Sequence, residues 1–523
     1  MSQKQQDAGT RHYDHYAATL PKWRYILRQW VLPLVRAETP PLAKMQSLAR
    51  APFLDSYFAF AANLGTHTFF MIFLPVLFWC GYNEYGRALV NLLAAGVIVS
   101  GIIKDILCLP RPMSPPLQRI TMSGSAALEY GFPSTHTTNA MSVALYAIHI
   151  LNSEAAEGLS PTARMAWVST LYLYAFSIAF GRLYCGMHGF TDVVAGGLLG
   201  ALITQVQIHF GERLYHWIID GSILHPLIYM LVLFFTIRTH PEPADDCPCF
   251  DDSVAFSGVL IGVNWSYWRI LQPHALLRLL LTRTTLEIQN AGVPLISWQT
   301  LIRIPLGVII IVAYRSVTKP LLLRGLPPLF RVIEHLDLDL PRRYFLRASQ
   351  YRTVPRLHRD DNVLPNPSDV GQMIGDVRRR RGRAISIGPQ SMADAREVIA
   401  YRRDARRRER SLSAGGTTRN PAHTDARSRE SSIEARLHRR TLSNESAFSL
   451  ASAAEEDEEE GSDAEVAANE RVAIFSAIPR IRIRYDVEVI TKLIVYTGIG
   501  WWAVEGCIVV FECLGLGPAR GLI

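Results

Sequence analysis

Charged residues and cysteines are both scarce in this chain of 523 residues. Charged residues make up 19% of it, against 49% hydrophobic residues. The seven cysteines show no zinc spacing, and most lie in or beside apolar runs, where free cysteine acts as a small hydrophobe. Only Cys247-Pro248-Cys249 is a close pair; its acidic loop could hold a disulfide or a weak metal site, although a plain polar loop is the favoured interpretation. No signal-peptide pattern follows the polar first residues, so we predict no cleaved leader.

The apolar residues are gathered in blocks rather than spread along the chain. About 20 consecutive apolar residues are needed to cross a bilayer, and several blocks approach that length. We therefore predict an all-α fold, a polytopic membrane helix bundle with about 8–10 crossings. The predicted crossings lie near residues 58–81, 88–107, 137–151, 165–180, 193–210, 223–237, 254–268, 304–314 and 489–513.

A segment of different composition, residues 351–470, precedes the last apolar block. It is rich in Arg, Ser, Asp and Glu, with arginine runs at 378–381 and 406–408 and an acidic run at 455–460. Such a composition buries too little apolar surface to offset the entropy of the chain, so we predict a long disordered insert. Hydroxyls such as that of Ser386 follow arginines, and we expect kinases to act on this insert.

The net charge of +8 is an average over unlike segments, because much of the arginine lies in residues 351–470. Nearer the start of the chain, residues 20–37 mix Trp23 and Trp30 with several basic residues. An interfacial amphipathic helix fits this pattern best, and a nucleic-acid patch is a poor second. We therefore expect the bilayer, and no nucleic acid, as a partner.

Three short segments carry cations or imidazoles at the ends of apolar blocks. Charged groups at such positions are costly to place in a membrane protein and tend to mark function. Arginine offers a two-pronged donor fork and lysine a mobile point charge, which together suit a tetrahedral phosphate dianion. The polar groups of interest, here called the seven motif residues, are Lys104, Arg111, Ser134, His136, Arg182, His188 and Asp192.

The local geometry expected of these segments supports one anion-binding site. Pro110 stops the helix that carries Lys104, so Arg111 should project from the following loop. Ser134 or Thr135 is a natural N-cap, which would direct backbone N–H groups and the positive end of a helix dipole toward an anion. His136 would begin that helix beside the same pocket.

His188 and Asp192 are four residues apart and share one face if their turn is helical. A carboxylate at that spacing can hold one imidazole N–H and leave the other ring nitrogen to attack phosphorus. The residues therefore favour a phosphoryl-transfer enzyme with a lipid substrate.

The motifs also resemble those of a known superfamily. They are similar to the three signature motifs of the type 2 phosphatidic acid phosphatases: Lys104 with six residues before Arg111-Pro112, the run Pro133-Ser134-Thr135-His136, and Arg182 with five residues before His188 and three more before Asp192. The sequence of residues 130–136 and 184–189 resembles more closely the branch of sphingosine 1-phosphate and long-chain base phosphate phosphatases. The wider superfamily usually has Gly in place of Thr135 and Ser in place of Gly181.

The resemblance implies a role for each motif residue. His188 would be the nucleophile, Asp192 its orienting partner and His136 the general acid for the leaving alcohol. It also implies a multi-pass protein of the endoplasmic reticulum membrane with its active site on the lumenal face. Because Lys104, Arg111 and Arg182 supply fixed positive charge, we expect that no metal or cofactor is used. The phosphate ligands that the resemblance implies are Lys104, Arg111, Ser134 and Arg182.

We therefore expect an integral-membrane phosphatase that dephosphorylates sphingoid long-chain base 1-phosphates through a phosphohistidine and without a metal. Two alternatives stay open: a phosphatase of another lipid phosphate, such as phosphatidate or an isoprenoid diphosphate, and a catalytically dead lipid-binding membrane protein. Glu129 and Asp105 stand next to motif residues. Either acid could meet the ammonium group of a sphingoid substrate or simply balance Lys104 or Arg111.

Nine crossings would put the active site and the insert on the same side of the membrane. One further passage or re-entrant segment between residues 269 and 301 would separate them, and because the insert is rich in arginine we expect a lumenal site with a cytosolic insert. The chain then divides into a polar and amphipathic N-terminal segment (1–56), a catalytic helix bundle (57–240), additional membrane helices and loops (241–350), the disordered insert (351–470) and a C-terminal membrane helix (471–523).

Overall fold

The computed structural model describes residues 8–64, 67–114, 116–120, 128–153, 158–272, 298–338, 342–354 and 483–516. They belong to one unit of the chain, residues 1–387 and 480–523, whereas the second unit, 388–479, lies outside the described residues. The described chain is all-α apart from a single pair of two-residue strands, so the predicted fold class is confirmed. Nearly all of the predicted disordered insert lies outside the described residues.

Each predicted crossing falls in helical chain, although the first one, 58–81, is divided between two helices that end at Asn63 and begin at His67. The helices are α1 (Tyr13–Thr19), α2 (Lys22–Ala37), α3 (Thr39–Ala49), α4 (Pro52–Asn63), α5 (His67–Trp79), α6 (Asn83–Leu107), α7 (Thr135–Leu151), α8 (Pro161–Tyr184), α9 (Phe190–Ile219), α10 (Leu224–Thr239), α11 (Cys249–Leu271), α13 (Trp298–His335), α18 (Val487–Trp501) and α19 (Cys507–Cys513). A π-helical turn, η4 (Trp502–Gly506), joins the last two, and a short 3₁₀ turn, η2 (Ala348–Gln350), follows strand β1 (Phe345–Leu346).

Within the described part of the chain, four runs of helix are long and apolar enough to cross a membrane: α6, α9, α13 and the continuous run from α18 to α19. Their outward faces carry large apolar side chains; on α9, for example, Leu198 is 68% exposed and Phe210 is 57% exposed. A soluble protein rarely leaves such a continuous apolar surface open, whereas lipid tails would cover it. The chain is therefore a multi-pass membrane protein.

The helix ends that carry the motifs are set by local capping. At the start of α7, Ser134 Oγ accepts a hydrogen bond from the backbone N–H of Thr137 at 3.4 Å. At the start of α9, Asp192 Oδ2 accepts one from the N–H of Gly189 at 2.8 Å. The helix α6 ends at Cys108, whose left-handed backbone (φ 50°) turns the chain away. Because α6 and α8 end where α7 and α9 begin, these four ends meet, and we call this side of the bundle the motif end.

Close packing between α7 and α9 fixes the two motif segments relative to each other. Gly196 lies so near α7 that a Cβ atom there would stand 2.6 Å from the carbonyl oxygen of Ser134. Ser142 Oγ donates to the carbonyl of Gly200 at 3.0 Å, and the N–H of Ser134 donates to the carbonyl of Asp192 at 3.0 Å. Small residues that let two backbones approach are the usual means of joining membrane helices.

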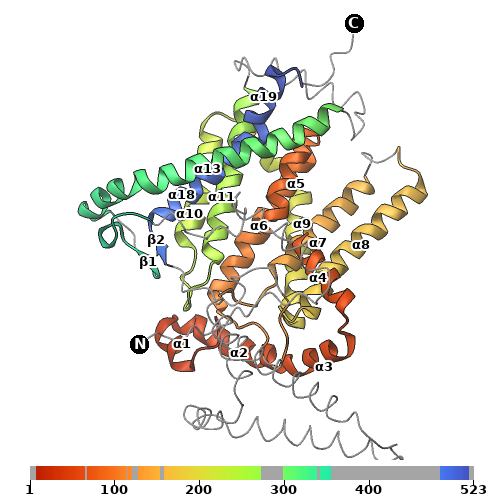
Figure 1. The fold of residues 1–523 in the computed structure, drawn as a ribbon, viewed down its shortest axis with the longest axis vertical. Coiled ribbons are helices and arrows are strands. Elements are labelled where there is room, and N and C mark those ends of the chain that lie inside the picture. Colours follow the sequence, from red (N-terminus) through yellow and green to blue (C-terminus); the bar gives the residue numbers. More distant parts are fainter. Residues whose placement is uncertain are drawn as a thin grey trace, which may run out of the picture. The chain divides into compact units, whose positions relative to one another are not determined.

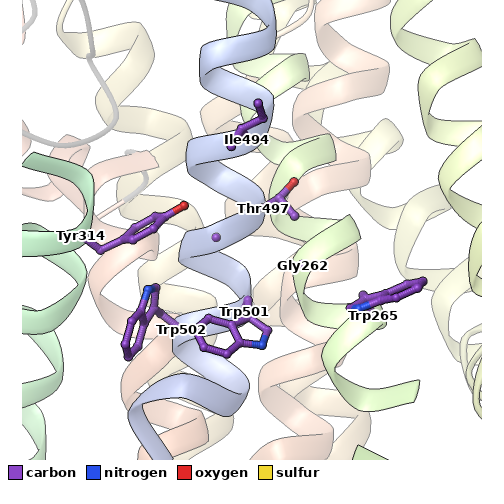
Figure 2. Close-up of a pocket in the computed structure, with 8 residues that line it drawn as sticks. Gly262, Trp265, Tyr314, Ile494, Thr497, Trp501 and Trp502 are labelled. Carbon is purple, nitrogen blue, oxygen red and sulfur yellow. The ribbon is translucent and has the colours of Figure 1, made fainter. Parts of the chain in front are cut away.

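The second half of the bundle is built on the contact between α11 and α18. A Cβ on Gly258 would stand 2.8 Å from the carbonyl oxygen of Leu493, so these backbones also nearly touch. A cavity of about 540 Å³ lies between α11, α13 and α18, and Figure 2 shows its rings from Trp265, Tyr314, Trp501 and Trp502. Gly262 in its wall is about 20 Å along α11 from the motif end at ~1.5 Å per residue, so this cavity is not part of the motif site.

The N-terminal helices lie across the motif end rather than apart from it, as Figure 1 shows for α1, α2 and α3. The amphipathic helix predicted at 20–37 forms as α2, but its arginines point inward: Arg24 and Arg28 are buried, whereas Trp30 is 78% exposed. Arg24 Nε donates to the carbonyl of Ile106 at 3.0 Å and Arg28 Nε to that of Cys108 at 3.2 Å. These arginines satisfy carbonyl groups that the end of α6 leaves open, which is why they turn inward.

The flanks of the insert both lie at the motif end. Strand β1, which precedes the insert, pairs in parallel with β2 (Arg484–Tyr485), which follows it. On one side Arg342 Nη1 donates to the carbonyl of His240 at 3.3 Å, and on the other Arg484 Nη2 lies 3.0 Å from Asp246 Oδ1. At the opposite end, α13 starts beside the end of α5, because Arg303 donates to the carbonyl of Trp79 at 3.4 Å.

These contacts correct the expected topology. The helix α11 finishes at the end opposite to the motifs, where Arg269 pairs with Glu505, and α13 starts from that same end. The end of α11 and the start of α13 therefore lie on one side, while the further passage expected between 269 and 301 falls mostly on residues 273–297, outside the described residues. A site on one side of the membrane with the insert on the other is thus not the arrangement that the described helices form.

We predict that substitution of Gly196 by Ala lowers the stability of the protein, because the new methyl group would press on the carbonyl of Ser134. Overpacking of this kind typically costs about 1–3 kcal/mol. The neighbouring Gly197 is the matched control: a Cβ there would meet only the flexible end of Met141 at 3.6 Å, so Gly197→Ala should be neutral or stabilising by up to about 1 kcal/mol. Thermal unfolding in detergent measures both. Equal unfolding temperatures for the two variants would contradict the close packing of α7 on α9.

We also predict that glycosylation reporters placed after Met113 and near Ser411 share one fate: both are modified or neither is. The reason is that the motif loops and both flanks of the insert lie at the same end of the helices. A third reporter at Gly81, before the start of α6, should behave in the opposite way. This topology would be refuted if the reporters near Ser411 and at Gly81 were both modified while the reporter after Met113 was not.

Candidate active site

Two of the motif cations converge on one acid. Lys104, in the last turn of α6, is 1% exposed and its ammonium group contacts Glu129 Oε1. Arg111, in the loop after α6, donates from Nη2 to Glu129 Oε2 at 2.7 Å and from Nε to the Glu129 carbonyl at 3.0 Å. Glu129 thus bridges the two cations, which is the balancing role that the sequence left open for it. Its carboxylate occupies donors of both cations.

His188 completes this cluster from the loop before α9. Its Nε2 lies 3.2 Å from Arg111 Nη1, and its Nδ1 lies 3.5 Å from Asp192 Oδ2. Both the imidazole and the carboxylate are buried, with 1% and 0% of their side chains exposed. The helical turn therefore does bring the pair together on one face, with one ring nitrogen toward the acid and the other toward the cations.

Arg182 reaches the cluster from the end of α8. It is buried, and its backbone carbonyl accepts hydrogen bonds from the N–H groups of Met187 at 3.0 Å and of His188 at 3.3 Å. Its Nε meets no hydrogen-bond partner among the described residues. A buried guanidinium N–H without an acceptor is energetically unfavourable, and an anion would satisfy it.

The segment before α7 forms the remaining wall. Ser134 is fully buried, and its hydroxyl oxygen accepts hydrogen bonds from the backbone and side chain of Thr137. Thr135, where the wider superfamily usually has Gly, shares a hydrogen bond of 2.8 Å with Ser100 and so ties α7 to α6. His136 is partly buried and stands near enough for its charge to act on both Glu129 and His188. The structure therefore gathers all seven motif residues in one place.

Gly181, the other departure from the wider superfamily, faces away from this cluster. A Cβ atom at this position would stand 3.0 Å from the ring of Phe58 in α4. A serine hydroxyl there would therefore meet an aromatic side chain of the bundle first. The absence of a side chain at this position therefore affects the packing of α8 against α4 rather than the cluster of motif residues.

The neighbouring cations lower the pKa of both loop residues of the site, His188 and Glu129, whereas burial lowers the first pKa and opposes the change in the second. Burial, together with Arg111, Arg182 and Lys104, lowers the pKa of His188 well below its usual range, so the imidazole is neutral at neutral pH. Burial alone would raise the pKa of Glu129, but Lys104 and Arg111 outweigh it and hold this pKa well below its usual range. The site thus combines a neutral imidazole with an ionised acid clamped between cations.

Two further residues support the site from the N-terminal helices, and no local pattern in the sequence marks them. Glu38, between α2 and α3, accepts a hydrogen bond from the N–H of Thr191 at 2.9 Å, just ahead of Asp192. Gln46 in α3 donates to the carbonyls of Gln118 and Tyr184 at 2.7 and 3.0 Å. The segment 1–56 therefore braces the loops that carry the motifs.

The motif residues do not form a metal site among the residues that the structure describes. There, the one group of side chains close enough to share an ion is Asp105, Cys247 and Cys249. It adjoins Lys104 but contains none of the seven. Asp105 itself points away from the cluster of Lys104, Arg111 and His188, toward the cysteines.

Comparison with known proteins agrees with this geometry. The pattern of the PAP2 superfamily matches residues 85–215, which include all seven motif residues. The chain is 39% identical over 325 residues to a dihydrosphingosine 1-phosphate phosphatase of Schizosaccharomyces pombe, covering 62% of this chain and 76% of that protein. It is 34% identical over 262 residues to a dihydrosphingosine 1-phosphate phosphatase of Saccharomyces cerevisiae, covering 50% of this chain and 64% of that protein.

More distant relatives extend the same series. Human sphingosine-1-phosphate phosphatase 2 is 26% identical over 351 residues, which cover 62% of this chain and 82% of the human protein. No solved structure matches the chain significantly. The stretch that matches the superfamily pattern holds the motif loops and the helices that carry them, and the alignment with the fission yeast protein covers three quarters of that protein. The chain belongs to the sphingosine 1-phosphate phosphatase family of the PAP2 superfamily.

Proposed function

We propose that this protein hydrolyses sphingoid long-chain base 1-phosphates through a phosphohistidine, without a catalytic metal. One observation carries the proposal most: His188 presents Nδ1 to Asp192 and Nε2 to a cluster of buried cations. Membership of a phosphatase family fits the same chemistry. We disfavour the alternative of a catalytically inactive lipid-binding protein, because the residues proposed as nucleophile, general acid and phosphate-binding cations all lie together.

In the proposed reaction the substrate phosphate takes the donors of Lys104, Arg111 and Arg182 and displaces the Glu129 carboxylate. Asp192 holds the proton on His188 Nδ1, so Nε2 keeps its lone pair and attacks phosphorus. The bond from phosphorus to the ester oxygen breaks. The three cations stabilise the charge that spreads over the equatorial oxygens, a task that fixed positive groups perform without a metal.

Protons and water complete the cycle. His136 donates a proton to the departing alkoxide and afterwards removes one from the water that attacks the phosphohistidine. This releases inorganic phosphate and restores His188. Ser134 binds a phosphate oxygen through its hydroxyl hydrogen, which is free to turn because its oxygen is the acceptor in the cap of α7.

Glu129 favours a sphingoid substrate over phosphatidate. In a sphingoid base phosphate the ammonium group is separated from the phosphoester oxygen by two carbon atoms, so it arrives beside the carboxylate that the phosphate has just displaced. Glu129 would then lose its contacts with Lys104 and Arg111 and gain one with the ammonium group of the substrate. Phosphatidate has no ammonium group, so with that lipid the displaced carboxylate would face the phosphate without a partner, which is unfavourable.

We propose the endoplasmic reticulum membrane as the location, with the site on the lumenal face as in the family that the motifs resemble. Because the flanks of the insert lie at the motif end, a lumenal site would hold the insert in the lumen too. Kinases would then reach the insert only if they act in that compartment. The reporters at Met113 and Ser411 therefore test the site and the proposed kinase partners together.

The substrate class is tested by phosphate release from the purified protein in detergent, with sphingosine 1-phosphate and phosphatidate compared. We expect Glu129→Gln to lower kcat/KM for sphingosine 1-phosphate by about tenfold to a hundredfold, the value of one charge-assisted contact. Turnover of phosphatidate should stay the same or rise, and inhibition by vanadate should become stronger, because no carboxylate competes for the cations. Glu84→Gln, at the far end of α6, is the control. Equal losses on both lipids would refute recognition of the ammonium group, and no turnover of either lipid by the wild type would refute the function.

The phosphohistidine is tested by trapping the labelled enzyme. His188→Ala should abolish both turnover and an acid-labile, alkali-stable phosphoenzyme, because it removes the attacking nitrogen. Asp192→Asn should keep weak but detectable activity, since it disturbs tautomer and orientation only. His149→Ala, in the last turn of α7, should label as the wild type does. Full labelling of the His188 variant would assign the nucleophile to another residue.

The general-acid role of His136 is tested by the leaving group. Proton donation of this kind contributes roughly 10²- to 10⁴-fold to a rate. A nitrophenolate leaves well without a proton, so His136→Ala should lose far more activity on a lipid phosphate than on nitrophenyl phosphate. A loss of the same size on both substrates would assign His136 to binding instead.

A further inference from the structure

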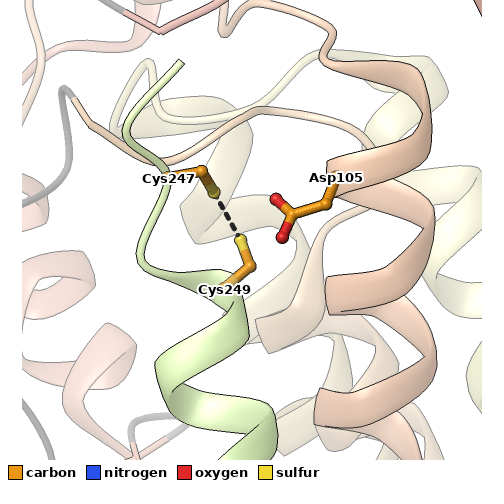
Figure 3. Close-up of side chains that lie close together, drawn as sticks. All are labelled: Asp105, Cys247 and Cys249. Atoms are coloured by element: carbon orange, nitrogen blue, oxygen red, sulfur yellow. Dashed lines mark hydrogen bonds between the residues drawn. The ribbon is translucent and has the colours of Figure 1, made fainter. Parts of the chain in front are cut away.

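A second group of reactive side chains lies beside the active site. Asp105 comes from the last turn of α6, and Cys247 and Cys249 come from the start of α11; Figure 3 shows the carboxylate pointing toward the two sulfur atoms. One ligand atom from each residue lies within 4.8 Å of the others. The two Sγ atoms are 2.8 Å apart, and all three residues are buried. The acidic loop around Cys247 is therefore not the plain polar loop favoured from the sequence.

The Asp105 carboxylate is an anion without the partners that burial requires. Its side chain is 0% exposed, and neither oxygen accepts a hydrogen bond from a nitrogen or oxygen donor among the described residues. The nearest basic nitrogen is His240 Nδ1, at 3.6 Å from Oδ2. A buried carboxylate in this condition costs several kcal/mol, so either a proton or a cation is needed to offset it.

We propose that Asp105, Cys247 and Cys249 bind a zinc ion, or another thiophilic divalent ion, that holds α6 and α11 together. Two thiolates and one carboxylate are ligands that zinc prefers, with bonds of about 2.3 Å to sulfur and about 2.0–2.2 Å to oxygen. Ligand atoms in such a site stand roughly 3–4 Å apart, so the sulfur atoms need only a small side-chain rotation. Each thiol releases a proton as it binds.

His240 is placed to supply the fourth ligand of the ion. Its Nδ1 lies 3.6 Å from Asp105 Oδ2 and 3.2 Å from the carbonyl oxygen of Pro241, so binding an ion through Nδ1 would replace the contact with Pro241, while its Nε2 is 3.3 Å from the hydroxyl of Ser253 in α11. A ligating histidine usually has its other nitrogen held by a polar neighbour. The ion would thus join the end of α6, the end of α10 and the start of α11.

The role of this ion is structural and goes beyond the phosphatase reaction. Asp105 directly follows Lys104, and Cys249 is close enough to Lys104 for their charges to interact. An ion on Asp105 would fix the turn that aims Lys104 at the phosphate, without taking part in the chemistry at His188. Loss of the ion should therefore raise KM for the lipid more than it lowers kcat.

Metal content of the purified full-length protein in detergent tests this site independently of activity. We expect about one zinc per chain by elemental analysis, lost in the Cys247→Ser/Cys249→Ser and Asp105→Asn variants and kept in Cys80→Ser, whose cysteine lies at the opposite end of α6. Should the variants not fold, reconstitution of the wild type with cobalt decides, because bound thiolates give a charge-transfer band. Alkylation followed by mass spectrometry shows the state of the two thiols. If protein grown with zinc contains no metal, and Cys247 and Cys249 form a disulfide or are both alkylated, the proposal is overturned.

Discussion

The motif end depends on one electrostatic constraint: two buried cations stand side by side and need an anion. Lys104 and Arg111 are both almost fully buried, and the cost of leaving such charges unpaired is several kcal/mol. Glu129 meets this need from the chain itself. In the proposed reaction a phosphate would replace the Glu129 carboxylate on these two cations, so its affinity would depend on the difference between the two anions. This favours ligands that also give Glu129 something to bind.

The scaffold around this pair is built from backbone groups as much as from side chains. Arg24 and Arg28 bind carbonyls at the end of α6, and Gln46 binds carbonyls of two loops. Glycines let α9 approach α7 until the N–H of Ser134 bonds directly to Asp192. Residues on four helix ends are thereby held to within hydrogen-bond distances. Such positioning is what allows charge stabilisation to act on a transition state.

Local pattern was enough to predict the helices and the meeting of the seven motif residues. Apolar blocks predicted where helices form, and the position of Lys104, Ser134 and His188 at block ends predicted that these residues come together, as they do at the motif end. What local pattern could not predict are contacts between distant segments. The inward turn of Arg24 depends on an open carbonyl 82 residues away in the chain. Whether Glu129 balances the cations of the protein depends on where its loop folds.

The pairing of β1 with β2 has a consequence for how this chain tolerates change. Because Leu346 and Tyr485 are direct neighbours in the pair, the two ends of the intervening chain are held side by side at one place on the bundle. The free energy of closing such a connection grows only with the logarithm of its length, by about 0.6 kcal/mol for each doubling. Insertions and deletions between β1 and β2 should therefore change the stability of the helix bundle very little. This junction is therefore where related proteins can differ most in length while they keep the same membrane bundle.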